Sequence, residues 1–302
     1  MVRPVRFRMN EETTVNNFFQ EDLDLQNELI NQKAQEEFDT LVGKLREVGV
    51  KVLAVDDLYE QNTPDSIFPN NWISFHQNGD VAIYPMFAEN RRRERREDIL
   101  DLVEAAGFVI ENVYDYTAAE KENLFLEGTG AMVLDRVHRK AYCALSPRAD
   151  EELLIEFCED FEYTPVIFKA YQQVNGVAEP IYHTNVMMAV AESFAVVCLE
   201  AIADKSERKN VLHHLKEDGK EVIAITVEQM LQYAGNMLQV RGEKGDYLVM
   251  SDSAYQVLTP QQRSQIERHC KILHSGIETI ETCGGGSARC MLAEIFLPKE
   301  VN

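Results

Sequence analysis

The sequence contains 302 residues with a formal net charge of −21, and 45% of the residues are hydrophobic. A chain of this length can bury a substantial core, whereas its charge opposes general affinity for nucleic acid or anionic membranes, because phosphate binding requires concentrated positive charge. No apolar run approaches the roughly 20 residues of a membrane helix, and the N-terminal residues lack the apolar stretch of a signal peptide. These features predict a cytoplasmic protein.

Hydrophobic periodicity and turn residues predict alternating helices and strands. In the first third of the chain these are an amphipathic helix over residues 17–48, a strand at Val50–Val55, a hairpin over Asn71–Tyr84, a helix at about Arg93–Ala106 and a strand at Phe108–Ile110. In the middle third they are strands at Ala131–Leu134 and Lys140–Leu145, a helix at about Arg148–Phe161, and strands at Pro165–Phe168, Val186–Glu192 and Phe194–Leu199.

The last third continues the pattern. It predicts a helix at Lys205–Lys216, strands at Glu221–Ile225, Met237–Val240 and Tyr247–Ser251, a capped helix beginning at Thr259, and a final strand at Ala288–Leu297. The order strand, strand, helix, strand therefore recurs nearly five times, at intervals of roughly 50–60 residues. We expect a cyclic arrangement that gathers the loops after each first strand around one axis. Because no linker interrupts the pattern, a single domain over residues 1–302 is expected.

The cysteines and the one basic cluster bear on whether the protein binds zinc or RNA. Six cysteines show no zinc-site spacing, and a chain this long needs no disulfides, so most are expected to be buried apolar side chains. The one basic cluster, residues 91–96, is open to an RNA-binding interpretation. A helix entrance is favoured instead, because acidic residues surround the cluster and no aromatic residues are interleaved for base stacking.

Three glycines, Gly284–Gly286, stand just before Cys290 at the start of the predicted last strand. Glycines let backbone amides approach a substrate closely, and a thiolate beside such a loop suits attack on a planar carbon. The local pattern is equally typical of a turn that leads to a buried cysteine.

Three other segments place polar residues directly before apolar strands. His183 lies where a loop enters a strand, a favourable place for a general acid or base, although a structural histidine fits there too. Glu127 begins Glu-Gly-Thr-Gly, which lacks the lysine and spacing of a phosphate loop and is equally typical of a plain turn. The segment Pro64–Trp72 is rich in Asp, Pro and Asn, which favour turns, so both a plain loop and a substrate-binding loop remain open.

Together the four segments resemble, in order and character, the guanidino-group-modifying enzymes, also called the pentein or amidinotransferase-like superfamily. The segments are Pro64–Trp72, Glu127–Gly130, His183–Met188 and Gly284–Met291. This superfamily includes arginine deiminases, dimethylarginine hydrolases, agmatine deiminases and amidinotransferases. The resemblance extends from about residue 60 to Leu297 and implies a five-bladed pseudo-symmetric α/β propeller. Pro64–Trp72 resembles the bacterial citrulline hydrolase (citrulline ureidase) branch in particular.

The resemblance implies a catalytic cysteine at Cys290, a histidine at His183 and a glutamate at Glu127. It assigns substrate binding to Asp65, Phe68, Asn71, Asn185, Arg148 and Arg91. Of the two arginines that match family residues holding a substrate carboxylate, Arg148 has the clearer alignment, because Arg91 lies in a run of arginines.

Two departures from arginine deiminases bear on the substrate. Those enzymes carry aspartates where this chain has Asn71 and Asn185, and the aspartates grip a cationic guanidinium. An amide cannot neutralise a buried cation, whereas its donor and acceptor suit a neutral ureido group. Citrulline is therefore favoured over arginine. In a competing interpretation, Asp65 alone binds a guanidinium.

The expected reaction is attack of Cys290 on the ureido carbon of citrulline, which yields ornithine and a carbamoyl thioester that water then hydrolyses. Glu127 is expected to raise the basicity of His183, and a protonated His183 to favour the thiolate. The partner is a small amino acid, no metal or organic cofactor is required, and a homodimer is left open. The alternatives are an arginine deiminase, a methylarginine hydrolase, a thiol protease of the papain type and a non-catalytic amino-acid-binding protein. The order Glu, His, Cys argues against the protease.

Overall fold

The computed structural model describes residues 1–23 and 25–300, and within these residues four three-stranded sheets share one design. In each sheet the first two strands pair antiparallel, and the third runs parallel to the second after a helical crossover. The sheets are β3 (Ile73–Phe75), β4 (Asp80–Ile83) and β5 (Asn112–Asp115); β6 (Met132–Asp135), β7 (Lys140–Ala144) and β8 (Thr164–Phe168); β11 (Met188–Val190), β12 (Phe194–Val197) and β13 (Glu221–Ala224); β14 (Leu238–Gly242), β15 (Gly245–Ser251) and β16 (Lys271–Ser275).

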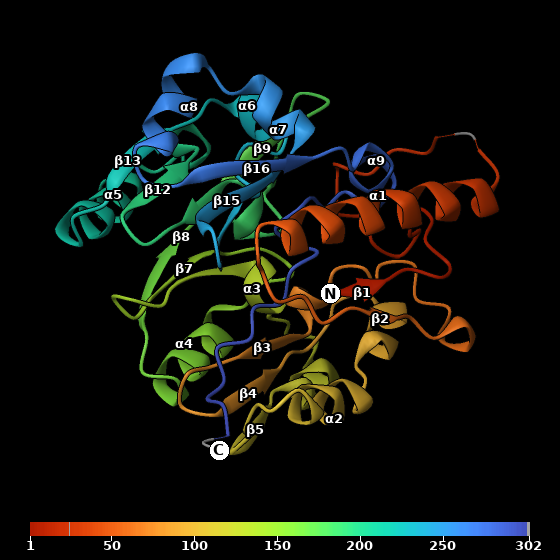
Figure 1. Cartoon of the computed structure of the whole chain (residues 1–302). Coiled ribbons are helices and arrows are strands. Elements are labelled where there is room, and N and C mark those ends of the chain that lie inside the picture. The colour runs from red at the N-terminus through yellow and green to blue at the C-terminus, as the bar shows by residue number, and fades with distance from the viewer. Residues whose placement is uncertain (24, 301–302) are drawn as a thin grey trace.

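Helices connect the second and third strands and lie around the outside of the molecule (Figure 1). They are α2 (Asp98–Ala105), α4 (Glu151–Asp160), α5 (Lys205–Glu217), and α7 (Asp252–Val257) with α8 (Pro260–Glu267). Their starts follow from local sequence: the side chains of Asp150, Asp204 and Thr259 accept hydrogen bonds from the first free backbone N–H groups of α4, α5 and α8. The predicted strand–strand–helix–strand repeat is thus present four times among the described residues.

The remaining elements lie at the two ends of the chain and in the segments that connect the strands and sheets. They are β1 (Val2–Arg3), α1 (Asn27–Glu47), β2 (Val55–Asp56), α3 (Gly128–Ala131), β9 (Tyr171–Val174), β10 (Val177–Pro180), α6 (Val227–Met230), α9 (Glu278–Gly284), and short 3-10 turns that include η2 (Pro69–Asn71), η3 (Glu89–Glu94) and η5 (Thr184–Val186). Strands β1 and β2 pair in parallel on either side of α1, which packs against α9 and β16. No helix among the described residues has the length and apolar character to cross a membrane.

Several predicted boundaries were wrong. The helix expected from residue 17 begins at Asn27 (Asp24 lies outside the described residues), because residues 10–20 form turns whose side chains bond elsewhere. The strand expected at residues 50–55 is confined to β2, and the one expected at residues 108–110 lies further along, at β5. Residues 288–297 form a turn and an irregular segment rather than a strand, and the hairpin β9–β10 was not predicted.

The first strands of the sheets lie next to one another, with β6 contacting β11 and β11 contacting β14. Together with β3 and residues 292–296 they surround a cavity of about 990 Å³. The polar residues of interest lie at the beginning of these strands, in the segments that precede them. The expectation that loops after each first strand build the site is therefore wrong.

Candidate active site

A small cavity unites most of the residues singled out in the sequence. Seven of the nine line it: Asp65, Phe68, Asn71, Arg91, Arg148, His183 and Cys290. The other two contact lining residues, since Glu127 bonds to His183 and Asn185 bonds to Cys290. The free space is about 10 Å³, room for about one water molecule. The cavity is therefore nearly filled by protein in this state.

Each unit of the fold supplies polar groups from the segment just before its first strand. Asn71 ends η2 before β3, Glu127 precedes α3 and β6, and Asn185 lies in η5 before β11. Cys290 lies in a turn in which its N–H donates to the carbonyl of Ser287 at 2.9 Å. These segments lie far apart in sequence, and the packing of the first strands brings them together.

His183 and Glu127 form a buried pair, with Nε2 and Oε2 2.7 Å apart. Burial opposes ionisation of Glu127, but Arg148, His183 and Arg91 outweigh it and hold the pKa of this carboxyl well below its usual range. Burial lowers the pKa of His183 to about 4, despite the hydrogen bond to Glu127. The imidazole is therefore neutral at neutral pH, with Nε2–H donating to the carboxylate and Nδ1 left as the proton acceptor. Glu127 raises the pKa of His183, as expected, but burial outweighs its contribution.

Two side-chain amides point at the sulfur of Cys290. The Nδ2 atoms of Asn185 and Asn236 lie 3.3 and 3.2 Å from Sγ. Cys290 itself is 3% exposed. Among the other cysteines, burial raises the pKa of Cys158 to about 12 and that of Cys270 and Cys283 to about 11, as expected of structural thiols.

Asn71 is held in one orientation close to His183. Its Oδ1 accepts a 3.0 Å hydrogen bond from Nη1 of Arg91, which turns Nδ2 away from the arginine. A methyl group on Gly130 would lie 2.2 Å from that Nδ2 and 2.8 Å from Nδ1 of His183. Only glycine leaves room for these two groups to stand side by side.

Glycines in the loop before Cys290 leave room for the ring of Phe68. A Cβ atom on Gly284 or Gly286 would lie 2.8 or 2.9 Å from Cζ of the phenyl ring, so the loop must be glycine to lie against this ring. The hydroxyl of Tyr182 donates to the carbonyl of Gly285 at 2.5 Å. The loop before Cys290 is thereby fixed on both sides.

The two buried arginines differ in their partners. Arg91 binds Glu94 through two contacts of 2.9 Å, and also bonds to Asn71 and to the carbonyl of Phe68. Arg148 donates chiefly to neutral oxygens of the N-terminal segment, the carbonyl of Thr13 at 3.1 Å and Oδ1 of Asn16. Arg91 is thus paired closely with a carboxylate, whereas Arg148 meets one only through Nη1, which lies 3.5 Å from Oε2 of Glu127.

Three buried polar atoms of the site have no hydrogen-bond partner among the described residues. They are Oδ1 of Asp65, Nδ2 of Asn71 and Oδ1 of Asn185. Unpaired buried polar atoms are costly and uncommon. Here they offer one donor and two acceptors to a polar molecule beside Cys290.

Sequence reasoning missed two groups of residues. Asn236 precedes β14 as Asn185 precedes β11, and this equivalent place in the next repeat was the signal available. The N-terminal turns are the second group: Asn10, outside the predicted elements, binds Asp65 at 2.7 Å, and Asn17, at the start of the predicted helix, binds the carbonyl of Gly284 at 3.3 Å. Because these partners lie 55 and 267 positions further along the chain, local sequence carried no signal for them.

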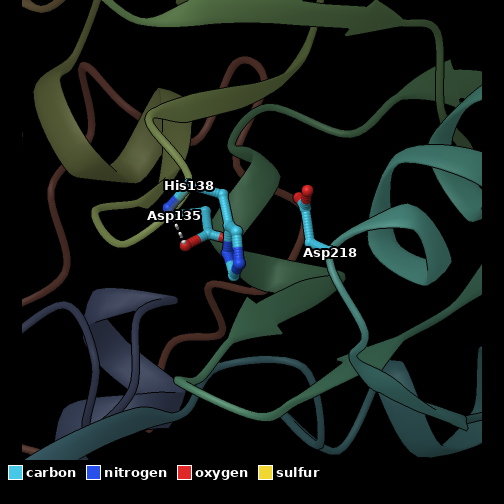
Figure 2. A group of neighbouring side chains, drawn as sticks. All are labelled: Asp135, His138 and Asp218. Carbon is cyan, nitrogen blue, oxygen red and sulfur yellow. Dashed lines mark hydrogen bonds and ion pairs between the residues drawn. The ribbon is translucent and has the colours of Figure 1, made fainter.

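One other cluster has the composition of a metal site. Asp135, His138 and Asp218 lie together (Figure 2), with potential ligand atoms within 4.8 Å of one another. Lys220 binds Asp135 and Lys140 binds Asp218, each at 2.8 Å. Since the lysines already neutralise both carboxylates, ion pairing accounts for the cluster.

The arginines of residues 91–96 also find partners within the protein. Arg95 binds Glu120 at 2.5 Å and Arg96 binds Asp98 at 2.6 Å, while Arg91 faces the cavity. The run forms η3 and precedes α2, in agreement with the helix-entrance interpretation.

Comparison with known proteins gives the family. A family model described as eukaryotic N,N-dimethylarginine dimethylhydrolase matches residues 3–297. No curated protein sequence matches the chain. Among solved structures, apo ArgZ, an arginine dihydrolase from the ornithine-ammonia cycle in cyanobacteria, aligns with a TM-score of 0.75 at 15% identity, covering 99% of this chain and 40% of that one.

Two further structures have the same fold. The N-terminal domain of that dihydrolase, a cysteine-to-serine variant bound to substrate, aligns with a TM-score of 0.71 at 17% identity over 98% of both chains. A dimethylarginine dimethylaminohydrolase adduct aligns with a TM-score of 0.60 at 16% identity, over 86% of this chain and 90% of that one. The chain spans about two fifths of the full-length dihydrolase and corresponds to its N-terminal domain.

The fold is that of a class of hydrolases that includes an arginine dihydrolase and a dimethylarginine dimethylaminohydrolase. Within that class, the chain belongs to the N,N-dimethylarginine dimethylhydrolase family. The expected superfamily is thereby confirmed, and the citrulline hydrolase branch stays a prediction.

Proposed function

We propose that the protein hydrolyses the ureido group of citrulline to give ornithine, carbon dioxide and ammonia, with Cys290 as nucleophile. The observation that carries this proposal is a pair of unpaired buried amide atoms, Nδ2 of Asn71, which lines the cavity, and Oδ1 of Asn185, whose Nδ2 contacts Cys290. A ureido oxygen accepts from the first, and a ureido N–H donates to the second. Both atoms are neutral, so they suit a neutral group better than a cation.

The orientation of each amide is supported by its other contacts. Oδ1 of Asn71 accepts from Arg91, and Nδ2 of Asn185 donates to Cys290 and to the carbonyl of Thr129. Flipping either amide would set donor against donor or acceptor against acceptor. The complementarity to a ureido group therefore does not depend on an arbitrary assignment.

His183 serves as the proton carrier in the proposed reaction. Neutral Nδ1 takes the proton of the Cys290 thiol, and the thiolate attacks the ureido carbon. The resulting imidazolium, held by Glu127, gives that proton to the leaving nitrogen of ornithine, leaving a carbamoyl thioester. Water, deprotonated by the same Nδ1, then releases carbamate, which decomposes to carbon dioxide and ammonia.

Arg148 is assigned to the carboxylate of the substrate. Its present partners on the N-terminal segment are neutral oxygens, and a carboxylate forms stronger, charge-assisted contacts. Arg91 is assigned instead to holding Asn71, because Glu94 already occupies two of its nitrogens.

A second candidate is hydrolysis of arginine to ornithine with release of two ammonia molecules. It is favoured by the unpaired Oδ1 of Asp65, a carboxylate oxygen that lines the cavity and suits a guanidinium. Burial raises the pKa of Asp65, opposed by Arg91 and Asn10, so a cationic substrate would also favour its ionised form. The arginine dihydrolase fold match agrees with this candidate.

We propose further that the chain is one catalytic domain with five blades. The fifth blade would combine β1, α1 and β2 with the irregular residues 292–297. Support comes from the side chains of Leu53, Ala293 and Ile295, which pack in one apolar cluster, and from the cavity that residues 292–296 line together with the four first strands.

The test is a substrate panel of citrulline, arginine, methylarginine and agmatine on the wild type and on Cys290→Ala, with ornithine, citrulline and ammonia quantified. We expect citrulline to give ornithine and ammonia in equal amounts, and Cys290→Ala to lose at least about 10⁴-fold in kcat. Asn71→Asp should weaken citrulline turnover. Arginine yielding ornithine with twice as much ammonia would establish the second candidate, and arginine yielding only citrulline and ammonia would reject both.

A further inference from the structure

Asn236 stands at the sulfur of Cys290 with its amide fully engaged. It is completely buried. Its Oδ1 accepts from the backbone N–H of Arg289 at 3.0 Å, and its Nδ2 donates to the carbonyl of Asn185 at 3.0 Å and to Sγ at 3.2 Å. All three groups of this amide are accounted for, and none is left for a substrate.

The direction of the amide is fixed by groups that cannot reverse. The backbone N–H of Arg289 is only a donor, and the carbonyl of Asn185 is only an acceptor. Oδ1 must therefore face Arg289, and an N–H of Asn236 must face Sγ. The backbone groups of Arg289 and Asn185 thus together orient Nδ2 of Asn236 toward Sγ of Cys290.

Asn185 also donates to Sγ, but its role differs. Its Oδ1 has no partner among the described residues, so this amide keeps one polar atom unengaged. Asn236 has no such atom, and its one side-chain partner is the sulfur.

The charge of the sulfur decides what these donors contribute. A neutral thiol is a weak acceptor, whereas hydrogen bonds to an ionised acceptor are roughly twice as strong as neutral ones. Two buried N–H groups at about 3.3 Å or less therefore favour the thiolate over the thiol. The charged and titratable groups around Cys290 are Asp65, Arg91, Glu127, Arg148, Tyr182, His183, Tyr233 and Arg289.

We propose that Asn236 is a further catalytic residue, which stabilises the Cys290 thiolate through Nδ2 without contacting the substrate. This inference rests on the proposed function in one respect, the assignment of Cys290 as nucleophile. Asn236 precedes β14 and therefore belongs to the repeat unit that follows the one carrying His183.

The test is a pH titration of the ultraviolet absorbance of the thiolate, taken as the difference between each protein and its Cys290→Ala counterpart. Asn236→Ala removes the donor, and Asn236→Asp keeps the size but replaces the donor with an acceptor. We expect the midpoint for the Cys290 signal to rise by about one pH unit or more in the alanine variant, and further in the aspartate variant. Gln229→Ala, which removes a buried amide remote from the sulfur, should leave the midpoint in place.

Steady-state kinetics separate this role from a structural one. With the substrate identified by the panel above, both Asn236 variants should lose about tenfold or more in kcat while KM changes by less than about twofold. Asn185→Ala should change both constants. An unchanged midpoint in both Asn236 variants would overturn the inference.

A second measurement needs no variant of Asn236. In wild-type protein with 15N-labelled asparagine, the side-chain amide signal of Asn236 should move with the same midpoint as the thiolate absorbance and stay still in Cys290→Ala. A signal that does not move in the wild type contradicts the proposal. If thiolate and amide titrate together but no substrate is turned over, the proposed function fails and this inference stands.

Discussion

The first strands of the sheets lie beside two cavities that differ in size and lining. Where the chain enters them, buried polar side chains leave about 10 Å³ of free space around Cys290. Along the strands and beyond, the chain surrounds about 990 Å³. The larger space has paired charges at its rim, such as Arg241 with Asp246 at 2.7 Å and Arg289 with Glu294 at 3.5 Å.

The difference teaches that cavity volume alone is a poor guide to the candidate site, because the residues singled out in the sequence line the smaller space. Near Cys290, Asn71 and Asn185 each leave a buried atom without a partner. Such atoms cost stability in the empty protein, and a bound substrate recovers that cost. Substitutions at this entrance end, where the chain enters the strands, should therefore affect activity more than substitutions elsewhere.

Apart from Cys290→Ala, the largest effect is expected for Gly130→Ala. The added methyl group would lie 2.2 Å from Nδ2 of Asn71 and 2.8 Å from Nδ1 of His183, so both reacting-site groups must shift. A misplacement of about 1 Å can cost about 100-fold in rate. We therefore expect kcat/KM to fall by about 100-fold or more, measured by ammonia release.

Gly43→Ala is the matched control for this prediction. Gly43 lies in α1 with no atom within 4 Å of the added methyl group, and alanine is the better helix former. Activity should be unchanged and stability slightly raised. Equal losses in the two variants would show that Gly130 has no special role at the entrance end.

The next largest effect separates the two arginines. Arg148→Lys loses a planar, two-point contact with a carboxylate, and we expect KM to rise by about 10- to 100-fold, with the thermal midpoint nearly kept. Arg91→Lys disturbs a buried pair with Glu94, and we expect it mainly to lower the free energy of unfolding. If the two variants exchanged these phenotypes, the carboxylate would belong to Arg91.

The sequence predicted the repeating unit and the polar segments, because both are local. Apolar periodicity marked β6, β7, α4 and β8 closely, and polar residues before the strands marked Glu127. The resemblance then joined segments that no local rule connects.

What the sequence could not predict depends on contacts across the chain. Residues 17–20 lie outside the helix because Asn17 bonds to the carbonyl of Gly284, more than two hundred residues away. Asn10 likewise bonds to Asp65, more than fifty residues away. The final strand fails because residues after Cys290 have no ladder partner among the described strands, although their apolar pattern suits one. The low pKa of His183 likewise follows from burial that only the tertiary fold creates.

A smaller effect concerns two histidines at the two ends of first strands. Burial lowers the pKa of His183, before β11, to about 4 and that of His76, after β3, to about 2. Unfolded histidines bind a proton below about pH 6.5, so the unfolded state binds more protons than the native state between these values. Stability must therefore fall as pH drops from 6.5, with each histidine adding a slope of about 1.4 kcal/mol per pH unit.

Urea denaturation between pH 7 and about 4.5 measures this slope. His76→Gln keeps a partner for Ser74 but cannot titrate, and it should reduce the slope. At the entrance end, kcat/KM should stay level as the pH is lowered and halve only near pH 4, where free His183 gains its proton. An acid limb centred near pH 6.5 would mean that His183 is not held neutral by burial.

The smallest effect is expected at the larger cavity. Val137 lines that cavity and is 61% exposed, so Val137→Ser changes an open wall rather than a packed core, and such substitutions usually alter stability by less than about 0.5 kcal/mol. Citrulline turnover should change by less than about twofold, measured beside Gly130→Ala in the same assay. A large loss of activity in Val137→Ser would mean that the two spaces are coupled through the strands they share, because Val137 itself does not line the cavity around Cys290.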